Sequence, residues 1–507
     1  MTQMTDDRQR FVANTWYLGG AQLVGTAATY VLLFALTKLG TEAYGLWVLT
    51  LLLASYLTPW ATLGLASALI RFCPTFPRFQ EQAAAYRLAS RASWWFSVLV
   101  ALGMAAGAKP LAAALLTGPQ QWPLVVLAAL LIPLEAQFQL GNSFLQVQER
   151  LGTYAALTSL RHLSEMGVLA ALVYWLPDLE LMLGARVLIL LLLVAGQHLV
   201  ACRGQGSAVA LHRGEELKRY LQFGLPMIPA TFIWVLIMGL DRFMLGKLAT
   251  LNVVAVYHAA DTVAVFLLNY TRPINGILQP RLANLIDRDP VEAQKYLGAA
   301  VKYLAILLFP GAVGLALVAG PLLGWVSHPE FSGAAALVPL LGVAYLLIGL
   351  TNPLYHLVFL RHGGKVFIWL YTLCLGVNFM LNWLLIPSHG GKGAVLATLG
   401  AFAVYVIGLL VCSEKSTLRT LRGLWRPLSL AAGCSLMMGG VLLALRKYAP
   451  LADSLLLVPL GAGIYGLLLL ASGLISRAEW LLLASPVLRL KDLLSARGKA
   501  LRLVSQK

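Results

Sequence analysis

Long, nearly uninterrupted runs of apolar residues are the feature that most constrains this chain. A helix of about twenty apolar residues covers the hydrocarbon core of a bilayer, and fourteen segments reach roughly that length. Only 12% of the residues are charged, against about 25% in soluble domains. We therefore predict an all-α polytopic membrane protein with these spans: 12–37, 44–69, 88–108, 123–147, 153–176, 181–202, 222–246, 253–278, 297–319, 333–360, 365–387, 393–412, 427–446 and 453–475.

The basic residues predict how the spans are oriented. The net charge is +17, and most Lys and Arg fall in alternate loops, as expected of loops that face the cytoplasm. This pattern explains the charge without a nucleic-acid partner. It predicts cytoplasmic termini at both ends of the chain and an even number of spans.

An internal repeat predicts how the spans are grouped. LTKLGTEAYG after the first span and LGKLATLNVVAVY after the seventh align Lys38 with Lys247, an offset of about 209 residues. We predict two six-helix halves in parallel topology, followed by an extra helix pair and a basic amphipathic cytoplasmic tail. The predicted units are 1–215, 216–423, 424–475 and 476–507.

Three motifs resemble one family of membrane transporters. FGLPMIPATFIWVLIMGLDRFMLGKL, from Phe223 to Leu248, resembles the seventh helix of Wzx-like polysaccharide flippases of the multidrug/oligosaccharidyl-lipid/polysaccharide exporter superfamily. LGLASALIRF (63–72) resembles part of their first helical hairpin, and NFMLNWLLIPSHGGKGAVLAT (378–398) their eleventh and twelfth helices. The resemblance implies a flippase for polyprenyl-diphosphate-linked oligosaccharide in the cytoplasmic (inner) membrane of a bacterium. Gly224, Pro226 and Pro229 predict a bend in the seventh span.

Charged residues inside the expected spans are the candidate site residues. A charge near the bilayer centre costs about 2.5–3.5 kcal/mol, so each one needs a partner or a function. The charges fall in the fourth, fifth, seventh and eighth spans, which belong to both halves, and a shared central cavity would bring them together. They are Glu135, Arg161, Glu165, Asp241, Arg242, Asp261 and Arg272.

In one interpretation these residues bind the substrate. Guanidinium groups match phosphate in bidentate geometry and stay charged when partly desolvated, which suits the diphosphate that the resemblance implies. Amides would hydrogen-bond the sugar hydroxyls. The predicted substrate-binding residues are Arg161, Arg272, Arg242, Glu135, Gln139, Asn142 and Asn269.

In the other interpretation the charges pair with each other and only hold the helices together. Arg161 would pair with Glu165 or Glu135, and Arg242 with an aspartate of the seventh or eighth span. Arg242 also has a second option, because it is close enough to the outer interface for its side chain to extend there. Arg186, near the outer end of the sixth span, is expected to do the same.

Other titratable residues have narrower candidate roles. Asp241, Asp261 and Glu165 are candidates to bind a coupling proton or Na⁺. Arg71 and Arg91 flank the inner mouth, where they either attract a phosphate or serve as ordinary positive-inside residues. The histidines and cysteines lack metal-ligand spacing, so we predict no metal, no other cofactor and no catalytic residue.

Three functions therefore compete. The flippase is favoured, with lipid-linked oligosaccharide and membrane lipids as its partners and a polymerase and chain-length regulator as further ones. A cation-coupled multidrug exporter of the same superfamily is the alternative, but such exporters usually have twelve helices. A membrane-embedded polysaccharide polymerase or ligase is the least favoured, because the expected outer loops are too short to hold a catalytic domain.

Overall fold

The described chain is built from helices that lie side by side. The computed structural model describes residues 2–202, 213–269, 271–326, 328–448 and 456–475, and this part contains no strand. Twelve of its helices are long and apolar enough to cross a membrane. The predicted all-α membrane fold is therefore confirmed. The two other expected spans correspond to α7 (Leu151–Trp175) and to the shorter apolar helix α21 (Leu457–Ser472).

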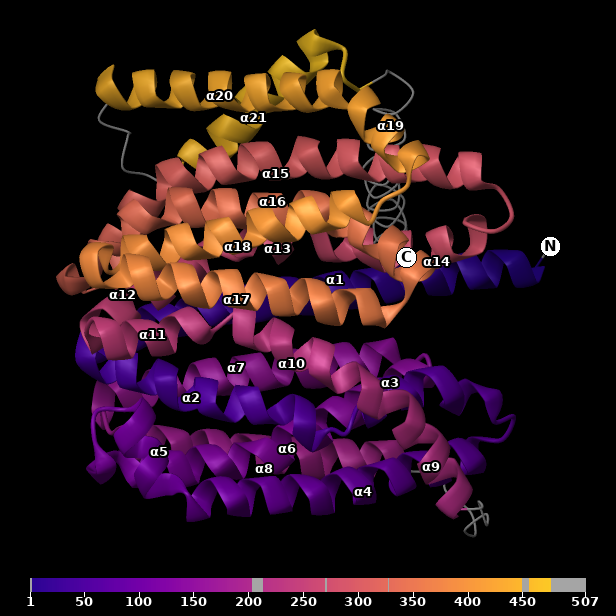
Figure 1. Ribbon diagram of the computed structural model, residues 1–507, viewed down its shortest axis with the longest axis vertical. Helices are drawn as coiled ribbons and strands as arrows, with labels where there is room; N and C mark the ends of the chain where they lie inside the picture. Colours follow the sequence, from indigo (N-terminus) through magenta and orange to yellow (C-terminus); the bar gives the residue numbers. More distant parts are fainter. Residues whose placement is uncertain (1, 203–212, 270, 327, 449–455, 476–507) are drawn as a thin grey trace, which may run out of the picture.

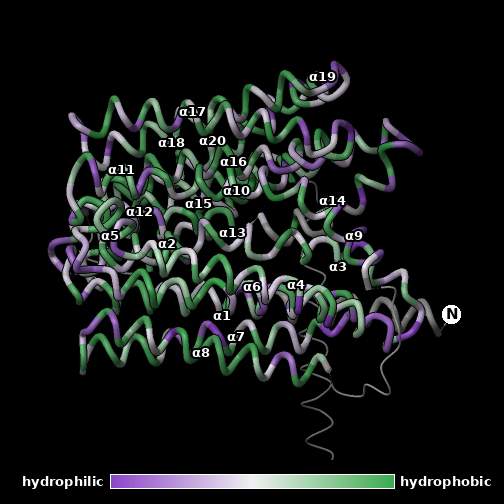
Figure 2. Tube along the Cα trace, turned by 60° about the horizontal axis from the view of Figure 1, so that its bottom comes forward, coloured by the Kyte–Doolittle hydropathy of each residue, from purple (hydrophilic) through white to green (hydrophobic). Residues whose placement is uncertain are grey.

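Polar segments gather at the two ends of these helices (Figure 2). In Figures 1 and 2, four elements lie at one end, which we call the α19 end: α3 (Leu65–Phe72), α9 (Arg213–Gly224), α14 (Thr271–Leu285) and α19 (Lys415–Gly423). The short helix α5 (Ala108–Leu115) lies at the opposite, or α5, end. Apolar middles between two polar ends are what a bilayer requires of a polytopic chain.

The first group of helices packs around α6. This helix (Trp122–Val147) contacts α2, α4 and α8. Its buried apolar side chains from Leu124 to Ala136 belong to the main core cluster, whereas Leu140 and Phe144 belong to a second one. α1 packs along α7. The bounds of the other long helices in this group are α1 Thr2–Leu36, α2 Thr41–Ala61, α4 Phe79–Ala106 and α8 Leu179–Cys202.

The second group packs around α16. This helix (Ala334–His362) contacts α12, α15 and α18, and α17 packs along α18. α20 lies on α15, and α21 packs against both. The bounds are α12 Leu251–Ala264, α13 Phe266–Asn269, α15 Pro290–Val326, α17 Gly364–His389, α18 Gly391–Val411 and α20 Trp425–Tyr448. The predicted amphipathic tail, 476–507, lies outside the described residues.

The seventh expected span is interrupted twice. α9 ends at Gly224, a short 3₁₀ turn covers Leu225–Met227, and α10 (Ile228–Ile237) begins just before Pro229. This break lies where the glycine and prolines predict it. A second break at Gly239 starts α11 (Leu240–Leu248). Gly239 allows α2 to approach, because a Cβ atom there would lie 2.7 Å from Leu52 Cδ1. Asp241 therefore falls in the first turn of a new helix.

Candidate functional site: two charge clusters and a cavity

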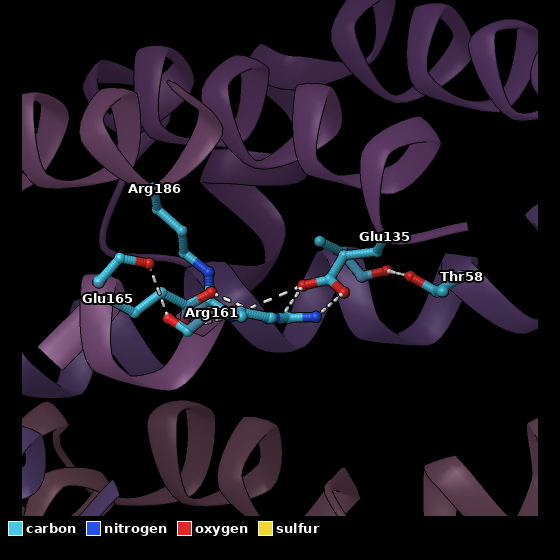
Figure 3. Close-up of polar contacts among 7 residues, drawn as sticks. Thr58, Glu135, Arg161, Glu165 and Arg186 are labelled. Atoms are coloured by element: carbon cyan, nitrogen blue, oxygen red, sulfur yellow. Dashed lines mark hydrogen bonds and ion pairs between the residues drawn. The ribbon is translucent and has the colours of Figure 1, made fainter. Parts of the chain in front are cut away.

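Arg161 in α7 joins two glutamates (Figure 3). Its Nη1 and Nη2 donate to the two carboxylate oxygens of Glu135 in α6 at 2.8 and 2.6 Å, and its Nε donates to Glu165 Oε1 at 3.1 Å. The guanidinium also lies over the Phe138 ring, 5.1 Å from its centroid. The Nη1 and Nη2 donors of Arg161 are thus occupied by Glu135, and a phosphate bound in bidentate geometry would need these same donors.

Arg186 in α8 completes this cluster. The prediction that its side chain extends to the outer interface is wrong: Arg186 Nη2 lies 3.6 Å from Glu135 Oε1 and 3.7 Å from Glu165 Oε2. These distances are too long for hydrogen bonds, and its Nε is buried without a hydrogen-bond partner among the described residues. The cluster therefore holds two arginines and two glutamates. Of the two arginines, Arg186 is the one that makes no hydrogen bond to the glutamates.

A cavity of about 520 Å³ lies beside the cluster, between α2, α3, α6, α8 and α10. Glu135, Gln139 and Arg186 line it. Four lining hydroxyls donate to backbone carbonyl oxygens three or four residues earlier in the chain, which leaves their oxygen lone pairs able to accept hydrogen bonds. These hydroxyls belong to Ser55, Thr58, Thr62 and Thr231.

A second charge cluster lies in the second group of helices. Arg242 in α11 pairs through Nη2 with Asp261 in α12, and its Nη1 donates to the Met238 carbonyl at 2.8 Å. The Tyr345 hydroxyl also donates to Asp261. Arg242 is therefore buried in an ion pair. Its side chain does not extend to the outer interface, which was the second possibility that the sequence allowed.

Asp241 is the second carboxylate of this cluster. The Arg242 side chain forms its ion pair with Asp261 and not with Asp241. It accepts hydrogen bonds from the Tyr257 hydroxyl and from the Arg242 backbone N–H, the latter at 2.8 Å. Asp241 is only 3% exposed. The described cluster thus contains two aspartates and one arginine, and its excess negative charge suits a proton or a small cation.

Of the other predicted site residues, Gln139 lines the cavity, whereas Asn142 and Asn269 are not among its lining residues. Asn142 accepts from Gln197 Nε2 at 2.8 Å, and Asn269 accepts from Gln22 Nε2 at 3.4 Å. Arg272 lies in α14, but its side chain is not among those that the structure describes. Among the described residues, no group of three His, Cys, Asp or Glu side chains could hold a metal ion.

At the α5 end, the two groups of helices are in contact beyond the cavity. The Thr41 hydroxyl donates to Asn252 Oδ1 and Glu330 Oε2, both at 3.0 Å, and its backbone N–H donates to Glu330 Oε2 at 3.1 Å. α2 and α12 approach so closely that a Cβ atom on Gly45 would lie 2.5 Å from the Leu251 carbonyl oxygen. We call this set the Thr41 contact.

At the α19 end, a second contact joins α3 to α9. The backbones meet at Gly64 and Gly224, where a Cβ atom on Gly224 would lie 2.7 Å from the Leu63 carbonyl oxygen. Arg71 is exposed and its guanidinium lies 4.7 Å from the centroid of the Phe223 ring. Along α2, the cavity residues from Leu51 to Thr62 thus lie between the Thr41 contact and this Gly64 contact, and Gly64 itself lines the cavity.

Arg91 lies on α4 with an exposed side chain.

Sequence reasoning missed Arg186, Tyr257 and Tyr345 as partners of the intramembrane charges. Arg186 carried a usable signal, since it is a guanidinium in an otherwise apolar span. A buried tyrosine in an apolar helix carries no comparable signal, because most such tyrosines serve as core residues.

Comparisons with known proteins identify the family. The model of the family described as "Polysaccharide biosynthesis protein" matches residues 38–328, more than half of the chain. The chain belongs to this family. No curated protein matches its sequence.

Solved structures confirm the fold of this polysaccharide biosynthesis protein. "Lipid II flippase MurJ, inward closed conformation" is 11% identical, with a TM-score of 0.71 over 90% of this chain and 98% of that chain. An inward-facing multidrug resistance MATE family transporter is 14% identical, with a TM-score of 0.63 over 78% and 95%. A MOP superfamily transporter from Pyrococcus furiosus is 16% identical, with a TM-score of 0.55 over 82% and 96%. The fold is that of the MOP transporters.

Proposed function

We propose that this transporter flips a polyprenyl-diphosphate-linked oligosaccharide from the cytoplasmic to the outer leaflet of a bacterial inner membrane. The family model supports a role in polysaccharide biosynthesis. The observation that carries the substrate assignment is Arg186, a cation that lines the cavity and whose Nε lacks a hydrogen-bond partner among the described residues. A diphosphate oxygen would supply that partner.

The cavity chemistry supports a substrate with both phosphate and sugar. Arg186 would take a diphosphate oxygen, while Arg161 keeps Glu135 and Glu165 in place. The lining hydroxyls that already donate to backbone carbonyl oxygens would accept from sugar hydroxyls. Gln139, which is exposed to the cavity, both donates and accepts. Arg272 and Arg242 remain candidates for later stages of transport, when other side chains face the cavity.

We propose Asp241 as the residue that binds the coupling cation or proton. Asp261 is already paired with Arg242, and Glu165 is paired with Arg161. Asp241 instead receives hydrogen bonds from Tyr257 and a backbone N–H, which stabilise a carboxylate without cancelling its charge. A bound cation would compensate this charge.

Transport would alternate between opening the Thr41 contact and opening the Gly64 contact. In this proposal the units 1–215 and 216–423 move against each other, and the pair 424–475 remains packed on α15. In the proposed orientation the α19 end and both termini face the cytoplasm, which the positive charge of the predicted cytoplasmic loops supports. Arg71 and Arg91 then lie on the entry side, and a polymerase and a chain-length regulator would take up the product at the outer face.

A cation-coupled multidrug exporter is the second candidate. The buried acidic excess around Asp241 and Asp261 favours it, because such a site also suits a cationic drug. The likeness to MATE family transporters shows the fold alone. The two clusters thus point to different substrates: the arginines to an anionic one and the aspartates to a cationic one.

The experiment that separates these functions measures lipid-linked oligosaccharide in host membranes after the protein is depleted. We expect this lipid to accumulate on the cytoplasmic leaflet and to return to normal when the wild-type chain is restored. Sensitivity to cationic dyes without lipid accumulation would replace the flippase with the exporter.

A further inference from the structure

A second pocket, which the proposed transport pathway does not use, lies at the α19 end. It has a volume of about 710 Å³ and is formed by the start of α15, the end of α16 and α19. Four basic side chains and one carboxylate line it, which leaves an excess of three positive charges. They are Lys295, Lys302, Arg361, Arg419 and Glu414.

The length of α15 leads us to expect the pocket at the depth of the lipid headgroups. α15 has 37 residues, about 55 Å at 1.5 Å per residue, so it extends beyond a hydrocarbon core of about 30 Å. The pocket uses only its first part, from Pro290 to Lys302. Trp425, directly after α19, is 70% exposed, and exposed tryptophans gather at membrane interfaces.

Fixed contacts hold the walls of the pocket in place. Gln294 Nε2 in α15 donates to Thr417 Oγ1 in α19 at 2.9 Å, and Arg361 in α16 pairs through Nη1 with Glu414. A Cβ atom on Gly298 would lie 3.3 Å from Thr420 Cγ2, so α19 lies directly on α15. A short amphipathic helix tied to two spans gives the pocket a defined shape.

Two polar atoms in these walls lack partners. Arg361 Nε, a donor, and Gln294 Oε1, an acceptor, are buried and make no hydrogen bond among the described residues. Both residues line the pocket. A donor and an acceptor in one pocket with excess positive charge suit a phosphate that also carries hydroxyl groups.

We infer that this pocket binds the headgroup of an anionic phospholipid, with its phosphate among Lys302, Arg361 and Arg419 and a headgroup hydroxyl on Gln294. In the proposed orientation this lipid belongs to the cytoplasmic leaflet. The bound lipid would link α19 to α15 and so secure the helix that leads into α20. This inference does not depend on which substrate the transporter carries.

The test compares lipid binding by the full chain in native mass spectrometry, with phosphatidylglycerol and phosphatidylethanolamine as probes. The variant is Lys302→Gln/Arg419→Gln, which removes two lining cations. The matched control, Arg78→Gln/Lys365→Gln, removes two exposed cations that do not line the pocket. Both variants are first checked for a single monodisperse species in detergent.

Wild-type protein should bind phosphatidylglycerol more tightly than phosphatidylethanolamine. The pocket variant should lose about thirtyfold in phosphatidylglycerol affinity, because each cation near an anionic headgroup contributes about 1 kcal/mol and about 1.4 kcal/mol is tenfold. The control should change by about twofold or less. Unchanged affinity in the pocket variant would overturn the inference. Displacement of the lipid by millimolar inorganic phosphate would also overturn it, since the occupant would then be a free phosphate compound.

Should the pocket variant fail to fold, the single variant Gln294→Leu provides the second measurement. It removes the unpartnered Oε1 and keeps all four cations. Because it also removes the Gln294–Thr417 hydrogen bond, Thr417→Val, which breaks the same bond but keeps Oε1, is the matched control. Gln294→Leu should bind phosphatidylglycerol more weakly and leave a phosphatidic acid probe, which lacks the headgroup hydroxyls, unaffected. If the affinities for both lipids fell equally, or if neither affinity fell, the placement of the headgroup would be contradicted.

Discussion

Replacing Arg161 by Met should destabilise the protein far more than the same change at Arg186. Arg161 makes three hydrogen bonds of 2.6–3.1 Å to two glutamates. Removing one partner of a buried ion pair costs about 3–5 kcal/mol. The side chains of Arg161 and Glu135 are 16% and 24% exposed, so water screens part of the charge. We therefore expect a loss of about 3 kcal/mol, the lower end of that range.

Arg186 makes no hydrogen bond to these glutamates, and its ion pairs are 3.6 and 3.7 Å long. Arg186→Met leaves both glutamates hydrogen-bonded to Arg161 and should therefore cost less, about 1 kcal/mol. The assay is denaturant unfolding of the purified variants in detergent micelles. Combining Arg161→Met with Glu135→Gln should recover part of the loss, because the double change removes an uncompensated carboxylate. Equal losses for the two arginine variants, or no recovery in the double variant, would refute the assignment of Arg161 as the structural cation.

Two further predictions concern coupling and the Thr41 contact. Asp241→Asn should leave the protein folded but make transport insensitive to the ion or proton gradient that drives it; a gradient response equal to wild type in reconstituted vesicles would rule Asp241 out. The Thr41 backbone N–H lowers the pKa of the exposed Glu330 carboxyl, so the contact is at full strength above about pH 4.3 and weakens as the pH falls through the lowered pKa. Hydrogen exchange at residues 41–45, corrected for intrinsic rates, should therefore rise in acid in the wild type but not in Glu330→Gln, and identical acid responses would contradict this role. His328 Nδ1, 3.8 Å from Glu330 Oε1, is kept in both proteins.

The fold could be predicted closely because lipid makes the sequence pattern simple. A run of apolar residues long enough to span leaves few alternatives to a helix, and the expected span 153–176 differs little from α7 at Leu151–Trp175. Glycine and proline near residue 224 also marked the first interruption of the seventh span. The second interruption, at Gly239, depends on close packing against Leu52 in α2, and a single glycine does not indicate that neighbour.

The site was less predictable because pairing depends on where side chains point across helices. The spacing of Arg161 and Glu165, one turn apart, places them on one face, and they do pair. Arg186 is close in sequence to the end of its span, which favours extension to the interface, yet its ion pairs with Glu135 and Glu165 hold it inside. Only the packing of α6, α7 and α8 brings the four charges together.

The most direct test of the proposed function is transbilayer movement of a labelled polyprenyl-diphosphate oligosaccharide in vesicles that contain the purified protein. Wild-type protein should expose the label to an outside reagent, and Arg186→Gln should abolish this exposure while keeping the unfolding midpoint close to that of wild type. Transport by Arg186→Gln at the wild-type rate would contradict the claim that the cavity binds its substrate through this arginine.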